Sequence, residues 1–389
     1  MISFPTRILA LIPLVTGIVA SGLVLGLAES RYPEGVSADP AWADMSCGSD
    51  DVRLLGFSDA LNKTAFGGFP VSELSGLSYD RQAERFTAVA DRAGAVQTHA
   101  FDIEIDVENL AVDAPEVAHV TVLKNGSGVP YNGFTFDAEG VVVDHRTDTV
   151  LVASESGSAV GEQPEFRRFS RDGDEVESLT VPQRFLIGTN NVSFESLSVS
   201  PNGKSLFTAM ERHLPADGAT ADFRSRVRIL QYEDLGDGFE AVREYFYLTE
   251  PGRTAPDLGV AEVLALSERS LLVLERGFIP TEGNTIRVFL ASLKDAEDVS
   301  GVPSLASGGQ PVEKRLVFDL ANCPEADAPI APGAVQVHAL HENFEAMTFG
   351  PDLSGNRQAL VLVSDDNGSA TQHTRVVALS VAADLGEWD

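Results

Sequence analysis

The sequence predicts an all-β fold: a single β-propeller of five four-stranded blades, closed by an N-terminal strand. Beyond residue 50, almost no segment shows the period of an amphipathic helix. Short runs rich in β-branched and aromatic residues alternate instead with turns of Gly, Asp, Asn and Pro. These runs sort into sets of four, and four strands form one propeller blade.

Each blade follows from its own set of runs. The first set is ELSGLSYD, RFTAVADR, AVQTHAFDIEID and AHVTVLKN, from residue 73 to residue 125. The second, third and fourth sets cover residues 138–182, 194–248 and 261–320 in the same way. The fifth set, residues 344–382, contains three runs, so the chain ends one strand short of a complete blade.

The missing strand is available near the N-terminus. The run VRLLGFSDA, residues 52–60, precedes the first set and belongs to none of them. A propeller that pairs such a strand into its last blade leaves no open sheet edge. We therefore predict residues 52–58 as the outer strand of blade five. The alternative is a sixth, short blade within residues 277–335.

Charge and composition exclude several classes of protein. The 389 residues include 28 Lys and Arg against 58 Asp and Glu, a net charge of −30. Such a surface argues against nucleic acid and anionic lipid as partners, and it permits cations such as Ca²⁺. The chain has only two cysteines, which excludes a disulfide-dense scaffold and a Cys₄ zinc or iron–sulfur site.

The N-terminus has the pattern of an export signal. Arg7 is the only charge before Glu29, and residues 8–28 form an apolar run that ends in small residues. The run is also long enough to remain as a membrane anchor. We expect a signal peptide or anchor in residues 1–28, a linker in residues 29–51, and a periplasmic or extracellular propeller in residues 52–389.

The two cysteines suit the predicted ring. Cys47 lies just before the closing strand, and Cys323 lies just after the outer strand of blade four, the neighbouring blade. An exported protein can form a disulfide between them, which would clasp the ring. Two unpaired thiols are the alternative.

Acidic residues repeat with the blades. Each first strand has a carboxylate near its start, and each second strand has one near its end. The first-strand acids are Glu73, Glu139, Glu195, Glu262 and Glu345. Their second-strand counterparts are Asp91, Glu155, Glu211, Glu275 and Asp365. Because residues equidistant from a hairpin turn face each other, we expect all ten at one mouth of the central channel.

Such a cluster of like charges needs a compensating group. One candidate is Ca²⁺, which binds carboxylate, amide and carbonyl oxygens. Arginine is the other, since Arg92, Arg212 and Arg276 each follow a second-strand acid. Nearby asparagines that could add neutral oxygens are Asn191, Asn343 and Asn367. In the structural alternative, each Glu accepts backbone N–H groups of the next blade and each Arg bridges two blades.

Four segments resemble the exported phytase-like family, described as "esterase-like activity of phytase". They are SELSGLSYD, NNVSFESLSVSPNGKSLFTAMER, AEVLALSERSLLVLERGF and NFEAMTFGPDLSGNRQALVLVSDDN. The resemblance implies a propeller that hydrolyses esters, with Ca²⁺ held by acids at the channel mouth. The metal ligands it implies are Glu73, Glu139, Glu195, Glu262, Glu345, Asp365 and Asp366. The catalytic residues we expect are Glu211, Glu275, Arg212 and Arg276.

The predicted function is therefore an exported, Ca²⁺-dependent hydrolase of phosphate or other esters that acts at the acidic mouth. Its partner would be a small-molecule substrate, and we expect a monomer. The alternative is a non-catalytic propeller of the cell envelope that binds a ligand or a protein partner, because one fold serves many functions.

Overall fold

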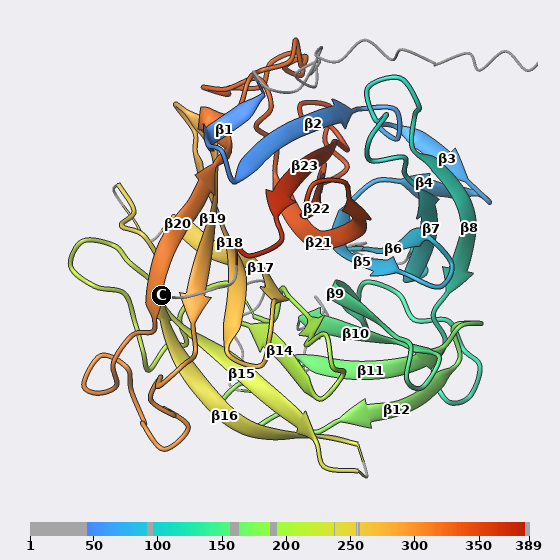
Figure 1. Ribbon diagram of the computed structural model, residues 1–389. Coiled ribbons are helices and arrows are strands. Elements are labelled where there is room, and N and C mark those ends of the chain that lie inside the picture. Colours follow the sequence, from blue (N-terminus) through green and yellow to red (C-terminus); the bar gives the residue numbers. More distant parts are fainter. Residues whose placement is uncertain are drawn as a thin grey trace, which may run out of the picture. The chain divides into compact units, whose positions relative to one another are not determined.

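The predicted five-bladed β-propeller is confirmed (Figure 1). The structure, a computed structural model, describes residues 45–91, 96–155, 163–186, 193–236, 238–253, 255 and 257–385. These residues belong to one compact unit, Pro40–Asp389. Among them the only helical element is a short 3₁₀ helix, η1 (Leu320–Asn322).

The first four blades are antiparallel sheets in chain order. Blade one comprises β5 (Leu74–Asp80), β6 (Arg85–Ala90), β7 (His99–Glu104) and β8 (Glu116–Val122). Blade two comprises β9 (Asp137–Asp144), β10 (Thr149–Glu155), β11 (Glu165–Ser170) and β12 (Glu175–Leu179). Blade three comprises β13 (Ser198–Val199), β14 (Ser205–Ala209), β15 (Arg226–Asp234) and β16 (Phe239–Leu248). Blade four comprises β17 (Leu258–Ala265), β18 (Ser270–Ile279), β19 (Gly283–Ser292) and β20 (Glu313–Asp319).

Blade five joins the two ends of the chain. Its strands from the channel outward are β21 (Phe344–Leu353), β22 (Arg357–Ser364), β23 (Val376–Ala382), β2 (Val52–Ser58) and β1 (Ser46–Ser49). Strand β2 is the predicted closing strand. Strand β1 is an additional strand, formed within the segment that we expected to be a linker. The alternative of a sixth blade is wrong, because the described residues between 277 and 335 belong to blade four and its loops. A small hairpin, β3 (Thr64–Phe66) and β4 (Phe69–Val71), precedes blade one.

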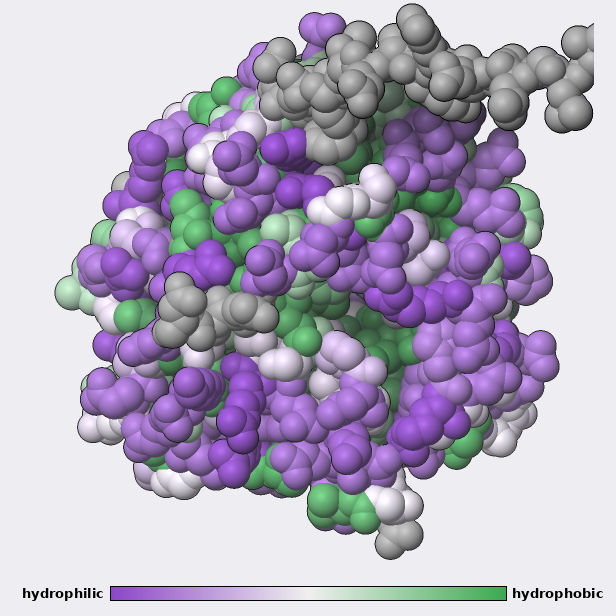
Figure 2. All heavy atoms as spheres, in the orientation of Figure 1, coloured by the Kyte–Doolittle hydropathy of each residue, from purple (hydrophilic) through white to green (hydrophobic). Residues whose placement is uncertain are grey.

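The core lies between the blades. Strands β9 and β10 are buried along their whole length, because each blade packs against neighbours on both faces, whereas the outer strand β8 has no buried residue. Between blades one and two, for example, Val89 packs in one apolar cluster with Val141 and Phe169. Figure 2 shows hydrophilic residues over most of the circumference and hydrophobic residues in the hollow near its middle.

The inner strands approach one another closely around the channel. A Cβ atom added at Gly76 would lie 2.2 Å from the carbonyl oxygen of Glu139, on the next inner strand. At Gly140 it would lie 2.6 Å from the backbone nitrogen of Leu197. Only glycine leaves room for these backbone contacts, so the single glycine in each of the first two inner strands follows from the tight ring.

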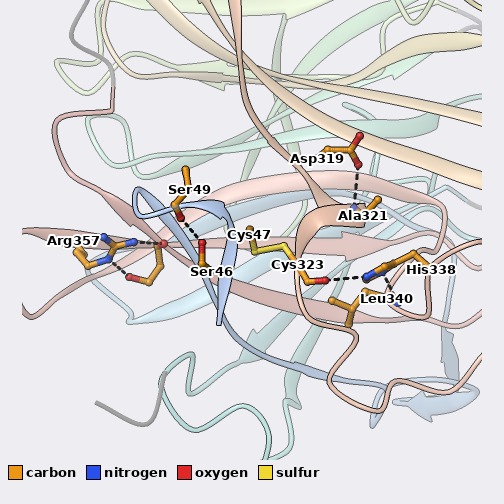
Figure 3. The surroundings of a disulfide bond; sticks show 10 residues. Ser46, Cys47, Ser49, Asp319, Ala321, Cys323, His338, Leu340 and Arg357 are labelled. Carbon is orange, nitrogen blue, oxygen red and sulfur yellow. Dashed lines mark hydrogen bonds between the residues drawn. A yellow bond between two sulfur atoms is a disulfide. The ribbon is translucent and has the colours of Figure 1, made fainter. Parts of the chain in front are cut away.

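The predicted disulfide is confirmed: Cys47 and Cys323 are bonded across 276 positions of the chain (Figure 3). Cys47 lies on β1 and Cys323 directly follows η1, so the bond ties blade five to blade four. Both cysteines are buried, and Nε2 of His338 lies 2.9 Å from the carbonyl oxygen of Cys323. The disulfide indicates folding in an oxidising, exported compartment. No helix in the described part of the chain is long and apolar enough to cross a membrane, and residues 8–28 lie outside that part.

Candidate functional site

One mouth of the channel lies where inner strands begin and second strands end. The Asp91 amide donates to the carbonyl of Glu73 at 2.8 Å, and the Asp365 amide donates to that of Asn343 at 3.0 Å. Beside these pairs, the pairing between the first and second strands shifts by one residue in blades one, two, four and five. Such β-bulges re-aim side chains next to a strand end, and here they accompany the turn of acidic side chains into the channel.

A cavity of about 510 Å³ opens at this mouth. Its described lining includes seven carboxylates, two guanidinium groups, four amides and one phenyl ring. The lining residues are Asp91, Glu139, Glu155, Glu195, Glu211, Glu345, Asp365, Arg212, Arg276, Asn284, Asn343, Asn367, Gln372 and Phe278. All five blades contribute, so residues far apart in sequence share one small volume. We call it the acidic cavity.

Burial and mutual repulsion raise the pKa values of its carboxyl groups. Burial and a hydrogen bond with Asp137 raise the pKa of Asp91 to about 8. Burial and nearby acids raise the pKa of Glu155 to about 8 as well, although the Ser193 amide donates to it. The pKa values of Glu139 and Glu195 lie well above the usual range, first through burial and then through neighbouring carboxylates. These groups therefore hold protons at neutral pH unless a cation joins them.

Arg276 is the buried cation of the acidic cavity. Its Nη2 lies 3.0 Å from Oε1 of Glu345 and 3.4 Å from Oε1 of Glu211. Its Nη1 donates to Oδ1 of Asn343 at 2.9 Å. Arg212 lies nearer the rim, with Nε 3.6 Å from Glu211. Both arginines thus lie on the side formed by blades three to five.

The opposite side, in blades one and two, contains the tightest group of acids. One carboxylate oxygen each from Asp91, Asp137 and Glu139 lies within 4.8 Å of the others. The carboxyl groups of Asp91 and Asp137 interact with each other, and Oδ1 of each is buried and accepts no N–H or O–H donor from any other described residue. A hard cation such as Ca²⁺ takes oxygen ligands of this kind, so the donor set fits that ion. Sequence reasoning missed Asp137, although it lies two residues before Glu139 and opposite Glu155.

Two residues that we predicted for the site, Glu262 and Glu275, bind other groups of the protein instead of lining the acidic cavity. Glu262 is fully buried and accepts the backbone N–H groups of Val263, Leu197 and Met347, the last two from neighbouring blades. Glu262 therefore follows the structural alternative, in which a repeated Glu accepts backbone N–H groups of a neighbouring blade. Glu275 accepts from the Tyr247 hydroxyl at 2.7 Å and lies 2.5 Å from Nζ of Lys314. It points away from the acidic cavity, whose lining includes the next residue, Arg276.

Glu73 and Asp366 also lie outside the described lining of the acidic cavity. In blade one, Ser75 lies in the bulge that Glu345 occupies in blade five, so Glu73 is two residues out of register. Asp366 pairs with Lys63 and accepts the Glu73 amide at 3.1 Å. The expectation that all ten repeated acids converge is therefore wrong for Glu73, Glu262 and Glu275. Arg92 and Asn191 lie outside the described residues.

Fold and site together define a β-propeller with a buried acidic cavity at one end of its axis. The sequence profile of the phytase-like family, described as "Esterase-like activity of phytase", matches residues 69–368. The chain belongs to this family. No curated protein matches its sequence.

Several solved structures are similar to the chain at low identity. Periplasmic gluconolactonase PpgL of Pseudomonas aeruginosa has 13% identity and a TM-score of 0.34, covering 79% of this chain and 86% of its own. The gluconolactonase XC5397 of Xanthomonas campestris has 10% identity and a TM-score of 0.34, covering 87% and 93%. The allergen Mala s 1 of Malassezia sympodialis has 10% identity and a TM-score of 0.41, covering 88% and 98%. These scores are too low for the activities of the neighbours to bear on this chain.

Proposed function

We propose that the protein is an exported, Ca²⁺-dependent hydrolase of small esters, which acts in the acidic cavity. One observation carries the proposal: seven carboxylates and only two guanidinium groups are among the described residues that line about 510 Å³. Crowded carboxylates destabilise the folded protein, so their presence indicates a function that offsets this cost. Perturbed pKa values also cluster at functional sites. Family membership and the disulfide support ester hydrolysis and export.

Asp91, Asp137 and Glu139 would hold the cation, because one carboxylate oxygen from each already converges. In addition, Oδ1 of Asp91 and Oδ1 of Asp137 accept no N–H or O–H donor from the other described residues. When bound there, Ca²⁺ would polarise an ester oxygen and lower the pKa of water. This set replaces part of the predicted ligand set, since Glu73, Glu262 and Asp366 are held elsewhere. Glu195, Glu345 and Asp365 line the same cavity and remain candidate ligands.

The remaining residues would bind substrate and move protons. Glu155 is buried with a pKa of about 8, which suits proton exchange near neutral pH, and we prefer it to Glu275 for that role. Arg276 would bind an ester oxygen through its guanidinium, and Glu211 would orient it from 3.4 Å. Arg212 lies at the rim, where it would meet the entering substrate. A cavity with so many carboxylates disfavours polyanions, so we expect uncharged esters to be better substrates than phosphates.

Calorimetry and turnover test the proposal together. Ca²⁺ should bind the purified protein and, at 100-fold its Kd, stabilise it by about 2.7 kcal/mol relative to EDTA. Hydrolysis of p-nitrophenyl acetate should require Ca²⁺ and exceed that of p-nitrophenyl phosphate. Glu139→Gln should weaken Ca²⁺ binding at least tenfold, whereas Asp352→Asn, an exposed acid of the opposite mouth, should leave it unchanged.

Two results would contradict the proposal. Absence of Ca²⁺ binding would remove the metal-dependent mechanism. Ca²⁺ binding without turnover of either ester would favour the alternative, a propeller that binds a ligand or a partner in the cell envelope.

A further inference from the structure

An unsatisfied amide lies in the wall of the acidic cavity. Asn284 is buried, at 2% exposure, and lines the cavity. Neither Oδ1 nor Nδ2 has a hydrogen-bond partner in the described part of the chain. Burying an amide without a partner is costly, and native proteins seldom leave both of its atoms unpaired. The side chain therefore indicates a ligand that supplies the missing hydrogen bonds.

The backbone fixes this amide in place. The N–H of Asn284 donates to Oε1 of Gln336 at 2.9 Å. The preceding residue, Gly283, has a φ of +87°, and a Cβ there would lie 2.1 Å from the carbonyl oxygen of Val335. The chain thus enters β19 in a conformation that only glycine adopts without strain. Asn284 is consequently held by its backbone and has a free side chain, as a binding residue should.

Arg276 and Phe278 extend the same wall. Asn284 pairs with Phe278 across β18 and β19, and Arg276 lies two residues further along β18, on the same face. Nε of Arg276 is buried and has no hydrogen-bond partner among the described residues, while its other nitrogens contact Glu345 and Asn343. Phe278 is 50% exposed at the cavity. The wall therefore offers one free acceptor atom, two free donor atoms and an apolar ring.

The pattern of free groups defines the chemistry of its ligand. Oδ1 of Asn284 needs an O–H or N–H donor, whereas Nδ2 of Asn284 and Nε of Arg276 need oxygen acceptors. Neighbouring hydroxyl groups supply both, and the C–H face of a sugar or cyclitol ring can pack against Phe278. Phosphate or carboxylate can only accept, and it would meet the carboxylates opposite. A plain acyl chain would leave every polar group of the wall unsatisfied.

We propose that Asn284, Arg276 and Phe278 form a subsite for the hydroxyl-bearing part of the substrate, which is an uncharged ester or lactone of a sugar or another polyol. The hydrolysis of such a substrate rests on the proposed function. The binding of its hydroxyl groups does not, because the same subsite should bind a polyol that cannot react. A site built to bond hydroxyl groups discriminates strongly against an analogue that lacks them.

Substrate preference is the first test. The wild type, loaded with Ca²⁺, should hydrolyse glucono-1,5-lactone with a kcat/KM at least 100-fold above that for δ-valerolactone, which has the same ring without hydroxyls. Asn284→Leu should reduce this ratio at least tenfold, mainly through the KM of the hydroxylated lactone. Asn202→Leu, the same change at an exposed asparagine of the opposite mouth, should leave the ratio as in the wild type.

Binding without reaction is the second test, and it separates the two proposals. Methyl α-D-glucopyranoside should bind the Ca²⁺-loaded wild type in calorimetry, and at least tenfold more weakly to Asn284→Leu. Phe278→Ser, at a half-exposed position, provides a second variant if Asn284→Leu does not fold. Turnover of p-nitrophenyl acetate without lactone preference or glucoside binding would overturn the polyol subsite alone. Glucoside binding without turnover of any ester would overturn the hydrolase and retain the subsite.

Discussion

The pKa values of buried carboxyl groups shift in opposite directions at the two mouths of the axial channel. The mouth opposite the acidic cavity has its own cavity, of about 440 Å³, with apolar walls such as Leu77 and Val141 and with Asp144 at its edge. Burial alone would raise the pKa of Asp144, but hydrogen bonds from Arg168 and Thr147 lower it below the usual value. At the acidic cavity, burial acts with neighbouring acids, and the pKa values of Asp91 and Glu155 rise to about 8.

This difference separates structural acids from functional ones. A buried carboxylate that the fold needs comes with donors from its own chain: Asp144 accepts from Nη1 of Arg168 at 2.7 Å and from the Arg146 amide at 3.0 Å. The acids of the acidic cavity have few such donors, so they must keep protons or receive a cation from solution. Burial alone therefore does not identify a site, whereas the absence of built-in partners does.

The largest predicted effect lies at the opposite mouth. Arg168→Leu removes the buried cation that pairs with Asp144 and should cost about 3–5 kcal/mol of unfolding free energy, because the buried carboxylate keeps its charge and loses its buried counter-charge. Urea denaturation measures the loss. Arg212→Leu is the matched control in the acidic cavity, where the side chain is 38% exposed, and it should cost less than 1 kcal/mol, about the upper range for exposed pairs. Equal losses at the two mouths would contradict the comparison.

The next effect is a pH dependence that the acidic cavity imposes. Asp91 and Glu155 have pKa values near 8 in the folded protein and near 4 when unfolded, so the folded state binds more protons in between. Stability without metal should therefore fall as pH rises from about 5 to 8, by at least ~2 kcal/mol. Thermal unfolding in EDTA at several pH values measures the slope.

Ca²⁺ provides the control for this slope. Saturating Ca²⁺ should flatten the fall, because the cation takes the place of the protons. A slope that is the same in EDTA and in Ca²⁺, or a stability that rises toward pH 8 in EDTA, would contradict our account of the acidic cavity.

A single substitution should reproduce part of that slope. Glu155→Gln keeps the shape of the protonated side chain and removes its ionisation. At pH 8 in EDTA it should raise the unfolding free energy by about 1.4 kcal/mol or more, the equivalent of one pKa unit. Urea denaturation at pH 4 and pH 8 measures the change, which should be largest at pH 8 and shrink toward zero at pH 4, where both states of the protein hold the proton. A loss of stability at pH 8 would indicate that Glu155 is a structural acid.

The sequence predicted the fold well because its signals are local. Turn residues bound each strand, and the unpaired run at residues 52–58 could belong only to the incomplete last blade. The disulfide followed from that topology. Strand β1 was missed, because four residues before a strand carry no distinctive pattern.

The site was predicted only in part, because bulges and side-chain direction are not local signals. A bulge at Ser75 placed Glu73 out of register. On β18, Arg276 rather than Glu275 turns into the acidic cavity. The backbone donors around Glu262 come from two other blades. No sequence pattern indicated Asn284, because it is identified only by the missing hydrogen-bond partners of its side chain in the described structure.

The smallest predicted effect tests whether burial, rather than charge, makes the two mouths differ. At the rim of the opposite cavity, Nη1 of Arg81 lies 3.7 Å from Asp352, and the two side chains are 55% and 77% exposed. Asp352→Asn should change the unfolding free energy by less than about 0.5 kcal/mol, because water and salt screen exposed pairs. It should also leave the pH slope in EDTA intact. A loss above about 1 kcal/mol would mean that surface charges around the ring are coupled, and that the acidic cavity cannot be treated as a separate electrostatic unit.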